Sequence, residues 1–185
     1  METRCDWCVG DRLLEQYHDT EWGVPKFDTR QLFECLTLEL MQTGLSWRTV
    51  LGKREAMRES FFDFDPVLVA NQGQECLRTW LQDARLIRHS GKLLAMINNA
   101  QIVARSGPAF SDDLWRAVGG TPVVNRYASI DEVPTQTELS RQVSLQLRKQ
   151  GFRFIGPVTT QSFMQAVGMV NDHLLHCFRH PEHPL

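Results

Sequence analysis

Cysteine and histidine residues stand close together near both ends of the chain. Cys5 and Cys8 are separated by two residues and followed by His18, and His173 precedes Cys177 by four residues. Thiolates and imidazoles at such spacings are typical zinc ligands, and residues four apart share one face of a helix. A closed set of four would be structural and would hold the chain ends together. Alternatively, His173 is a surface histidine and Cys177 a core thiol; spacing by itself favours Cys8 as a ligand, whereas His18 needs the fold to bring it near.

A carboxylate stands on the apolar stripe of a predicted helix. Leu32, Leu36 and Leu40 recur at helical spacing, and Glu39 lies inside their stripe rather than opposite it. A carboxylate on a buried face costs several kcal/mol unless it is paired or hydrogen-bonded, so it is often a site residue with a shifted pKa. The alternative is a structural glutamate that caps a backbone group or pairs with an arginine.

Four aromatic residues accompany this carboxylate: Trp7, Tyr17, Trp22 and Trp47. Aromatic faces stack on planar ligands, and more strongly on cationic ones. Together with Glu39 they predict a pocket for a planar ligand, although single tryptophans are usually core residues.

A third cluster is basic. Residues 80–96 read as two helices joined by a short turn, and Ser90-Gly91 begins the second helix with free backbone N–H groups. With Arg88 and Lys92, this helix start could hold a DNA phosphate. The alternative is a hairpin of helices with a solvated basic edge.

Composition limits the classes of protein that fit. The chain has 185 residues, 42% of them hydrophobic, enough for one well-filled core, so we expect one domain over residues 1–185. A net charge of −2 excludes wholesale electrostatic binding of nucleic acid and leaves room only for a local basic patch. Five cysteines, no apolar N-terminal run and no apolar stretch of about 20 residues predict a cytoplasmic protein with reduced thiols or a metal, without a signal peptide or membrane span.

Helical periodicity recurs along the chain, and no segment shows sustained alternation, so we expect an all-α helical bundle. A capping box from Thr135 to Glu138 predicts the start of one helix, and Gly151 its end. A last long helix is expected from Gly156 to Cys177, and 119–134 is the least regular stretch. The other expected helices cover 11–18, 31–43, 47–61, 65–71, 74–82, 90–105 and 112–118.

The order of these motifs resembles the 3-methyladenine DNA glycosylase I family, the zinc-containing branch of the helix-hairpin-helix glycosylases. The resemblance extends nearly from end to end. It rests on Arg4-Cys5-x-Trp7, Tyr17-His18-Asp19-x-Glu21-Trp22-Gly23-Val24-Pro25, Leu38-Glu39, Gly44-Leu45-Ser46-Trp47, Ile87-Arg88-His89-x-x-Lys92, Gly151-Phe152-x-Phe154-x-Gly156, Ser162-Phe163-Met164-Gln165-Ala166 and Asn171-Asp172-His173-x-x-x-Cys177.

The resemblance implies a compact bundle with a helical hairpin at about 74–105 and one structural Zn²⁺ per chain that clamps the terminal segments. The ligands carried over from the family motifs are Cys5, His18, His173 and Cys177. Cys8 then becomes a bystander. Arg85 stands where many relatives have a glycine in the hairpin turn.

The resemblance also implies an activity: hydrolysis of the N-glycosidic bond of N3-methyladenine in double-stranded alkylated DNA after base flipping, without lyase activity. Free 3-methyladenine is the product, and we expect a monomer. Trp47, with Trp7 and Trp22, would stack on the base, and Tyr17 and Glu39 would hydrogen-bond its edge.

Glu39 is also the catalytic candidate, as an electrostatic stabiliser of a sugar with oxocarbenium character. Gly44 and Leu45 would lie at the DNA-facing rim, with Leu45 as a wedge in the gap left by the flipped base, and Arg88 and Lys92 would contact phosphate. Two other classes compete with this reading. One is a catalytically inactive zinc-stabilised module that binds DNA or a protein partner, and the other is a zinc hydrolase with an open coordination position.

Overall fold

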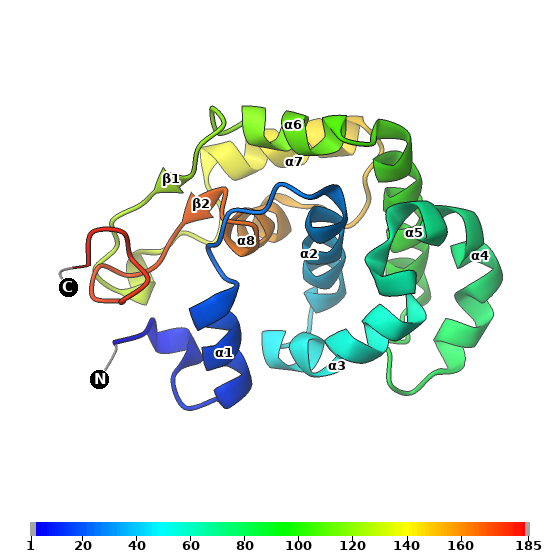
Figure 1. The fold of residues 1–185 in the computed structure, drawn as a ribbon, viewed down its shortest axis with the longest axis horizontal. Coiled ribbons are helices and arrows are strands. Elements are labelled where there is room, and N and C mark those ends of the chain that lie inside the picture. Colours follow the sequence, from blue (N-terminus) through cyan, green and yellow to red (C-terminus); the bar gives the residue numbers. More distant parts are fainter. Residues whose placement is uncertain (1–2, 184–185) are drawn as a thin grey trace.

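The computed structural model describes residues 3–183, which fold almost entirely into helices (Figure 1). The prediction of an all-α protein is confirmed. The helices are α1 (Arg12–Thr20), α2 (Thr29–Gln42), α3 (Trp47–Ser60), α4 (Pro66–Gln82), α5 (Ser90–Ser106), α6 (Ala109–Arg116), α7 (Glu138–Lys149) and α8 (Pro157–Ala166), with short 3-10 turns η1 (Asp6–Cys8), η2 (Phe62–Phe64) and η3 (Ile130–Glu132). Two short strands, β1 (Val123–Val124) and β2 (Val170–Asn171), pair in parallel.

Helix α2 lies at the centre, between α5 and α8 (Figure 1). The side chain of Asp28 accepts a hydrogen bond from Gln31 N and so caps the helix. Nearly every residue from 32 to 41 is buried, because helices pack around most of its circumference. Since α2 has almost no solvent face, Glu39 is held in the interior of the protein.

Helix α4 is continuous where the sequence predicts two helices, 65–71 and 74–82. The predicted cap is present: Asp65 accepts hydrogen bonds at the start of the helix and Pro66 follows it. Gly73 is buried against α5, and a Cβ there would lie 2.8 Å from Ile97 Cγ1. The glycine thus allows a close approach of the two helices instead of ending one of them.

The last predicted helix is wrong beyond residue 166. Helix α8 ends at Ala166, and Gly168 turns the chain with a φ of +71°. A Cβ on Gly168 would lie 2.5 Å from Pro25 N, so the residues after α8 pack directly on the segment before α2. His173 and Cys177 therefore lie in an irregular segment and not on a helix. A turn, in which Cys177 N donates to Leu174 O at 2.8 Å, brings these two residues together in place of the predicted helix face.

The capping box of α7 is shifted from its predicted position. Thr137 and Ser140 exchange side-chain and backbone hydrogen bonds at the helix start. The predicted pair, Thr135 and Glu138, falls two residues too early because Glu138 is already the first helical residue.

The two terminal segments lie side by side at one end of the molecule, beside α1, whereas α4 and α5 form the other end (Figure 1). Phe178 N donates to Thr3 O at 2.8 Å, and Leu174 packs with Cys5 and Cys177 in a small core of its own. Within residues 3–183, no helix is both long and apolar enough to cross a membrane.

Candidate functional site

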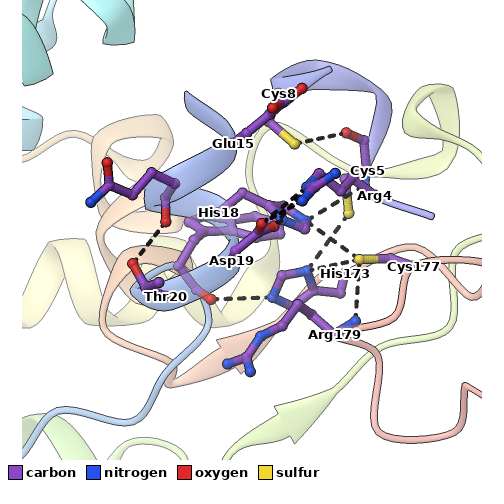
Figure 2. Close-up of polar contacts among 12 residues, drawn as sticks. Arg4, Cys5, Cys8, Glu15, His18, Asp19, Thr20, His173, Cys177 and Arg179 are labelled. Atoms are coloured by element: carbon purple, nitrogen blue, oxygen red, sulfur yellow. Dashed lines mark hydrogen bonds and ion pairs between the residues drawn. The ribbon is translucent and has the colours of Figure 1, made fainter. Parts of the chain in front are cut away.

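Four buried side chains from the two ends of the chain converge: Cys5, His18, His173 and Cys177 (Figure 2). Their donor atoms all lie within 4.8 Å of one another. Cys177 Sγ is 3.4 Å from His18 Nε2 and 3.5 Å from His173 Nδ1, and Cys5 Sγ is 3.7 Å from His173 Nδ1. The structure thus brings together all four residues carried over from the family motifs.

These four residues fit a metal ion. Ligands bound to a tetrahedral Zn²⁺ through Zn–S and Zn–N bonds of about 2.0–2.3 Å lie about 3.3–3.8 Å from one another. The three separations given above fall in this range, and two thiolates with two imidazoles are a typical zinc set. The pKa of Cys177 is lowered, first by its hydrogen bond with Cys5 and then by the imidazoles of His173 and His18.

Cys8, the competing ligand, points elsewhere. Its thiol donates to Cys5 O at 3.1 Å, and it is not a member of the cluster (Figure 2). The 3-10 turn η1 (Asp6–Cys8) aims the two cysteine side chains in different directions. Cys8 therefore supports the backbone of a ligand.

Each imidazole of the cluster is oriented by its outer nitrogen. His18 Nδ1 donates to Asp19 at 2.8 Å, and Arg4 in turn holds that carboxylate with contacts of 2.8 and 3.0 Å. His173 Nε2 donates to Trp22 O at 3.1 Å. Hydrogen bonds from Arg4 lower the pKa of Asp19 and keep it anionic. Such outer partners fix the tautomer that offers a lone pair to a metal.

We expect Asp19→Asn to weaken metal binding by 10- to 100-fold, the usual cost of losing an outer partner of a histidine ligand. The amide lacks the charge that fixes His18 and that pairs with Arg4. Competition with a chromophoric chelator measures the affinity. Asp113→Asn is the matched control, since Asp113 pairs with Arg116 on the surface of α6 and with no other charged group among residues 3–183. An affinity within twofold of wild type for Asp19→Asn would contradict the assigned role.

A cavity of about 400 Å³ opens next to the metal cluster. It is lined by Trp7, Tyr17, Trp22, Trp47, Glu39, Asp172, Gln42, Gln161, Gln165, Cys5, Leu174, Ser162, Val158 and residues 130 and 133–135. Two carboxylates and four aromatic rings thus face one space, and no lysine, arginine or histidine of the described chain lines it. This lining suits a planar ligand that carries positive charge.

The carboxyl group of Glu39 lies in this cavity without a hydrogen bond or an opposite charge from the described residues that would offset its burial. Glu39 is 5% exposed, and burial raises its pKa to about 8. Within the described part of the chain, neither a backbone group nor an arginine bonds its carboxyl group, so the structural alternative considered from the sequence finds no partner. Glu39 is therefore mainly protonated at neutral pH in the empty cavity, and a ligand offering charge or donors would favour its ionised form.

The four aromatic residues contact one another edge to face in a row that runs from Trp47 through Tyr17 and Trp7 to Trp22. Tyr17 and Trp47 meet edge to face with centroids 5.2 Å apart, and the Trp47 indole N–H is buried without a partner among residues 3–183. Trp7 and Trp22 instead pack against the metal cluster, with Trp22 4.5 Å from His173 between ring centroids. The cluster thus lies directly behind one wall of the cavity.

Sequence reasoning missed the polar side of the cavity. Asp172 is buried and accepts hydrogen bonds from Gln165 Nε2 at 2.7 Å, Gln161 Nε2 at 3.2 Å and Asn125 Nδ2 at 2.6 Å. The hydrogen-bond partners of Asp172 come from α8 and from the end of β1 and meet it only in the folded chain, so they could not be predicted from the sequence. The one sequence signal for Asp172 is its position directly before the predicted metal ligand His173. The irregular stretch 119–134 supplies part of the same wall, with Ile130 and Val133.

The turn between α2 and α3, which the resemblance assigns to a DNA-facing rim, is exposed. Gly44 has a φ of +77°, which favours glycine, and Leu45 is 40% exposed. Ser46 caps α3 immediately after the turn. Arg88 is also exposed, just before α5.

Lys92 is buried, whereas a contact with a DNA phosphate requires an exposed side chain. Its Nζ donates to Met41 O at 2.9 Å and to Thr43 O at 2.6 Å. These carbonyls end α2, where a cation compensates the helix dipole. Lys92 therefore ties α5 to the turn that carries Gly44 and Leu45.

The hairpin turn accommodates Arg85 without strain, since this residue is not among those with positive φ in the described chain. Its guanidinium pairs with Asp83 and Glu59, and Lys53 donates to Arg85 O. A glycine is thus not required at this position.

Comparisons with known proteins agree with this site. The family described as "Methyladenine glycosylase" matches residues 7–180. DNA-3-methyladenine glycosylase 1 of Escherichia coli is 45% identical over 181 residues, which cover 96% of this chain and 97% of that protein. A crystal structure of 3-methyladenine DNA glycosylase I superposes with a TM-score of 0.93 at 46% identity, covering 97% of this chain and 100% of that one. A variant of 3-methyladenine DNA glycosylase I in complex with 3-methyladenine gives 0.92 at 35% identity, covering 98% and 99%.

The fold and the aromatic cavity with its two carboxyl groups are those of a helical DNA glycosylase that removes alkylated bases. The chain belongs to the methyladenine glycosylase family. The family resemblance predicted from the sequence motifs is confirmed.

Proposed function

We propose that this protein hydrolyses the N-glycosidic bond of N3-methyladenine in double-stranded alkylated DNA and releases the free base. The observation that carries the proposal is the buried and unbonded Glu39 carboxyl group in a cavity lined by four aromatic rings and no basic side chain. Such a site selects a flat, cationic base over the neutral bases of undamaged DNA. The relatives named above act on 3-methyladenine, according to their names.

The chemistry needs little acid catalysis, because N3-methylation leaves the purine positively charged and a good leaving group. After extrusion of the nucleotide, Trp47 and its neighbours stack on the base, and Glu39 and Tyr17 hydrogen-bond its edge. The bond between C1′ and the purine nitrogen breaks, and its electron pair neutralises the base. Water adds to C1′, its proton passes to solvent, and neutral 3-methyladenine and an abasic site remain. Glu39, ionised beside the cation, stabilises the positive charge that moves from base to sugar.

DNA would approach the face that holds the turn after α2 and the start of α5. We assign Leu45 as the wedge in the gap left by the extruded nucleotide, with Gly44 allowing close approach of the backbone. Arg88 and the free N–H groups at the start of α5 would hold phosphate. Lys92 supports the turn from inside and is left out of the DNA contacts.

We further propose one structural zinc ion per chain, held by the four-residue cluster. When bound, zinc supplies a closed cross-link between the chain ends, with no open position for substrate. We also propose that the protein is cytoplasmic, since all five cysteines are free thiols in the structure. We further propose that it is a monomer with a single domain over residues 1–185.

Release of bases from N-methylated duplex DNA, followed by chromatographic identification, tests this function. We expect 3-methyladenine from the wild-type protein and roughly 5- to 150-fold slower release by Trp47→Ala, because stacking on one base contributes about 1–3 kcal/mol. Metal content and circular dichroism verify the fold of the variant. No release by folded, zinc-loaded wild-type protein would refute the enzymatic proposal and favour the inactive DNA-binding module.

A further inference from the structure

Phe154 is an exposed aromatic residue in an unusual backbone conformation. Its side chain is 42% exposed, and its φ is +55°, in the left-handed region. A bulky residue adopts this region only when the surrounding structure holds it there. Glycine would fit at lower cost, so the local backbone does not itself require a phenyl ring.

Neighbouring helices fix the backbone on both sides of Phe154. The buried side chain of Asn99 accepts a hydrogen bond from Arg153 N at 2.9 Å and donates to Arg153 O at 3.1 Å. Ser144 Oγ on α7 donates to Ile155 O at 2.7 Å. The segment therefore presents the phenyl ring to solvent on a rigid support.

The ring lies beside the first turn of α5. Its centroid is 6.3 Å from that of His89, the residue that caps α5. Its Cζ atom lies 3.6 Å from the position that a Cβ on Gly91 would take. Val158, four residues later in the chain, is exposed and lines the cavity. Phe154 thus lies against the start of α5 and is four residues before a residue of the pocket lining.

The proposed wedge adjoins the same turn of α5. The hydrogen bond from Lys92 Nζ to Thr43 O, at 2.6 Å, holds the turn with Gly44 and Leu45 against the beginning of this helix. Two exposed apolar side chains, Leu45 and Phe154, therefore border a helix start whose free N–H groups suit a phosphate. This surface combines the apolar side chains of Phe154 and Leu45 with the N–H groups at the start of α5. Duplex DNA opened at one nucleotide offers matching partners, since it exposes base faces next to backbone phosphates.

We propose that Phe154 is a second apolar contact to duplex DNA at the lesion, which packs on a base left unstacked when the damaged nucleotide leaves the helix. The inference rests on the proposed function and adds a specificity-determining residue to its DNA interface. An aromatic ring on an exposed base face compensates the stacking lost on extrusion. The contact forms only with an opened duplex, so it strengthens binding to the lesion and not to intact DNA.

The test compares Phe154→Asn with wild type in binding to a duplex that contains a stable abasic-site analogue. Asparagine tolerates the left-handed region and removes the ring. We expect about tenfold weaker binding to this duplex, less than a twofold change for intact duplex, and an unchanged slope of affinity against salt. Arg88→Ala should instead lower the salt slope by about 1, since it removes a phosphate contact.

Phe27→Asn is the matched control. Phe27 is 56% exposed and stacks on Trp115. Thr29, two residues away, bonds Gly107 O at the other end of α5, and this helix of 17 residues is about 25 Å long. The control should bind both duplexes as wild type does. Phe154→Tyr, which keeps the ring, should restore lesion binding to within about twofold.

Three results would overturn the inference: wild-type binding by Phe154→Asn, an equal loss on both duplexes, or a parallel loss of affinity for free 3-methyladenine, which would make Phe154 a residue of the pocket or of the fold. Phe154→Gly, which relieves the backbone, serves as the second ring-free variant if Phe154→Asn does not fold. Base release by the wild-type protein separates this inference from the proposed function, because it persists if only the role of Phe154 is wrong.

Discussion

Glu39→Gln is expected to lower kcat/KM for 3-methyladenine release by about 10²- to 10³-fold, the usual effect of removing one electrostatic contact to the transition state. The same substitution should stabilise the folded protein at pH 8 by roughly 2–4 kcal/mol. Both effects have one cause. Burial raises the pKa of Glu39 to about 8, so the fold holds a carboxyl group whose charge only the substrate compensates.

The two effects depend on pH in opposite directions. Between about pH 4.5 and 8 the unfolded chain has lost the Glu39 proton while the folded chain keeps it, so the contribution of Glu39 to stability falls as pH rises through this range. Excision needs the anion, so kcat/KM should rise with pH towards about 8. Both trends should be absent in Glu39→Gln.

Denaturant unfolding and single-turnover excision, each measured from pH 5 to about 9 on both proteins, give the two profiles. The difference between wild type and variant isolates this one group from all others that titrate. A variant that is less stable than wild type at pH 8 would show that Glu39 is a structural residue, and a variant as active as wild type would show that excision does not need its charge.

Removal of the metal is expected to lower the melting temperature by at least about 10 °C. In a protein of this size 1 kcal/mol corresponds to roughly 2–4 °C, and a structural zinc contributes several kcal/mol. Cys177→Ser should reproduce the effect of a chelator, since it removes a buried ligand. The matched control is Cys76→Ser on α4, outside the cluster, which should bind zinc and melt as wild type does.

Hydrogen exchange shows which segments lose stability when the metal is removed. Protection should fall in residues 3–22 and 168–183 and persist in α2 and α5, because the latter belong to the main core. Base binding should fall too, since Trp7 and Trp22 pack on the cluster. An unchanged melting temperature after complete chelation would exclude a structural role for the metal.

The sequence alone predicts helices well where an apolar stripe and a cap agree. Helix α3 follows its predicted range to within one residue, and Asp65 with Pro66 marks the start of α4 as expected. Prediction fails where a distant partner decides the local structure. Gly73 reads as a break until Ile97 is seen against it, and Gly168 ends α8 because Pro25 lies on its backbone.

The same division applies to the site. Glu39 is evident because a carboxylate interrupts an apolar helical stripe, and the aromatic residues are evident because four of them accompany it. Spacing within the chain favoured Cys8 over His18 as a ligand, which is wrong because the thiol of Cys8 donates to Cys5 O and lies outside the cluster. Lys92 looks like a phosphate contact in the sequence, and only the packing of α5 on α2 shows its bonds to backbone carbonyls.

The meeting of the chain ends has a consequence for biosynthesis. Because the cluster joins Cys5 to Cys177, the pocket wall built by Trp7 and Trp22 is completed only when nearly the whole chain has left the ribosome. Helices α2 to α5 can begin to pack earlier, since α4 packs on α5 and α2 packs on α3 and α5, whereas the contact between α2 and α8 forms only later. Nascent chains and truncated products that end before Cys177 therefore lack a finished base pocket.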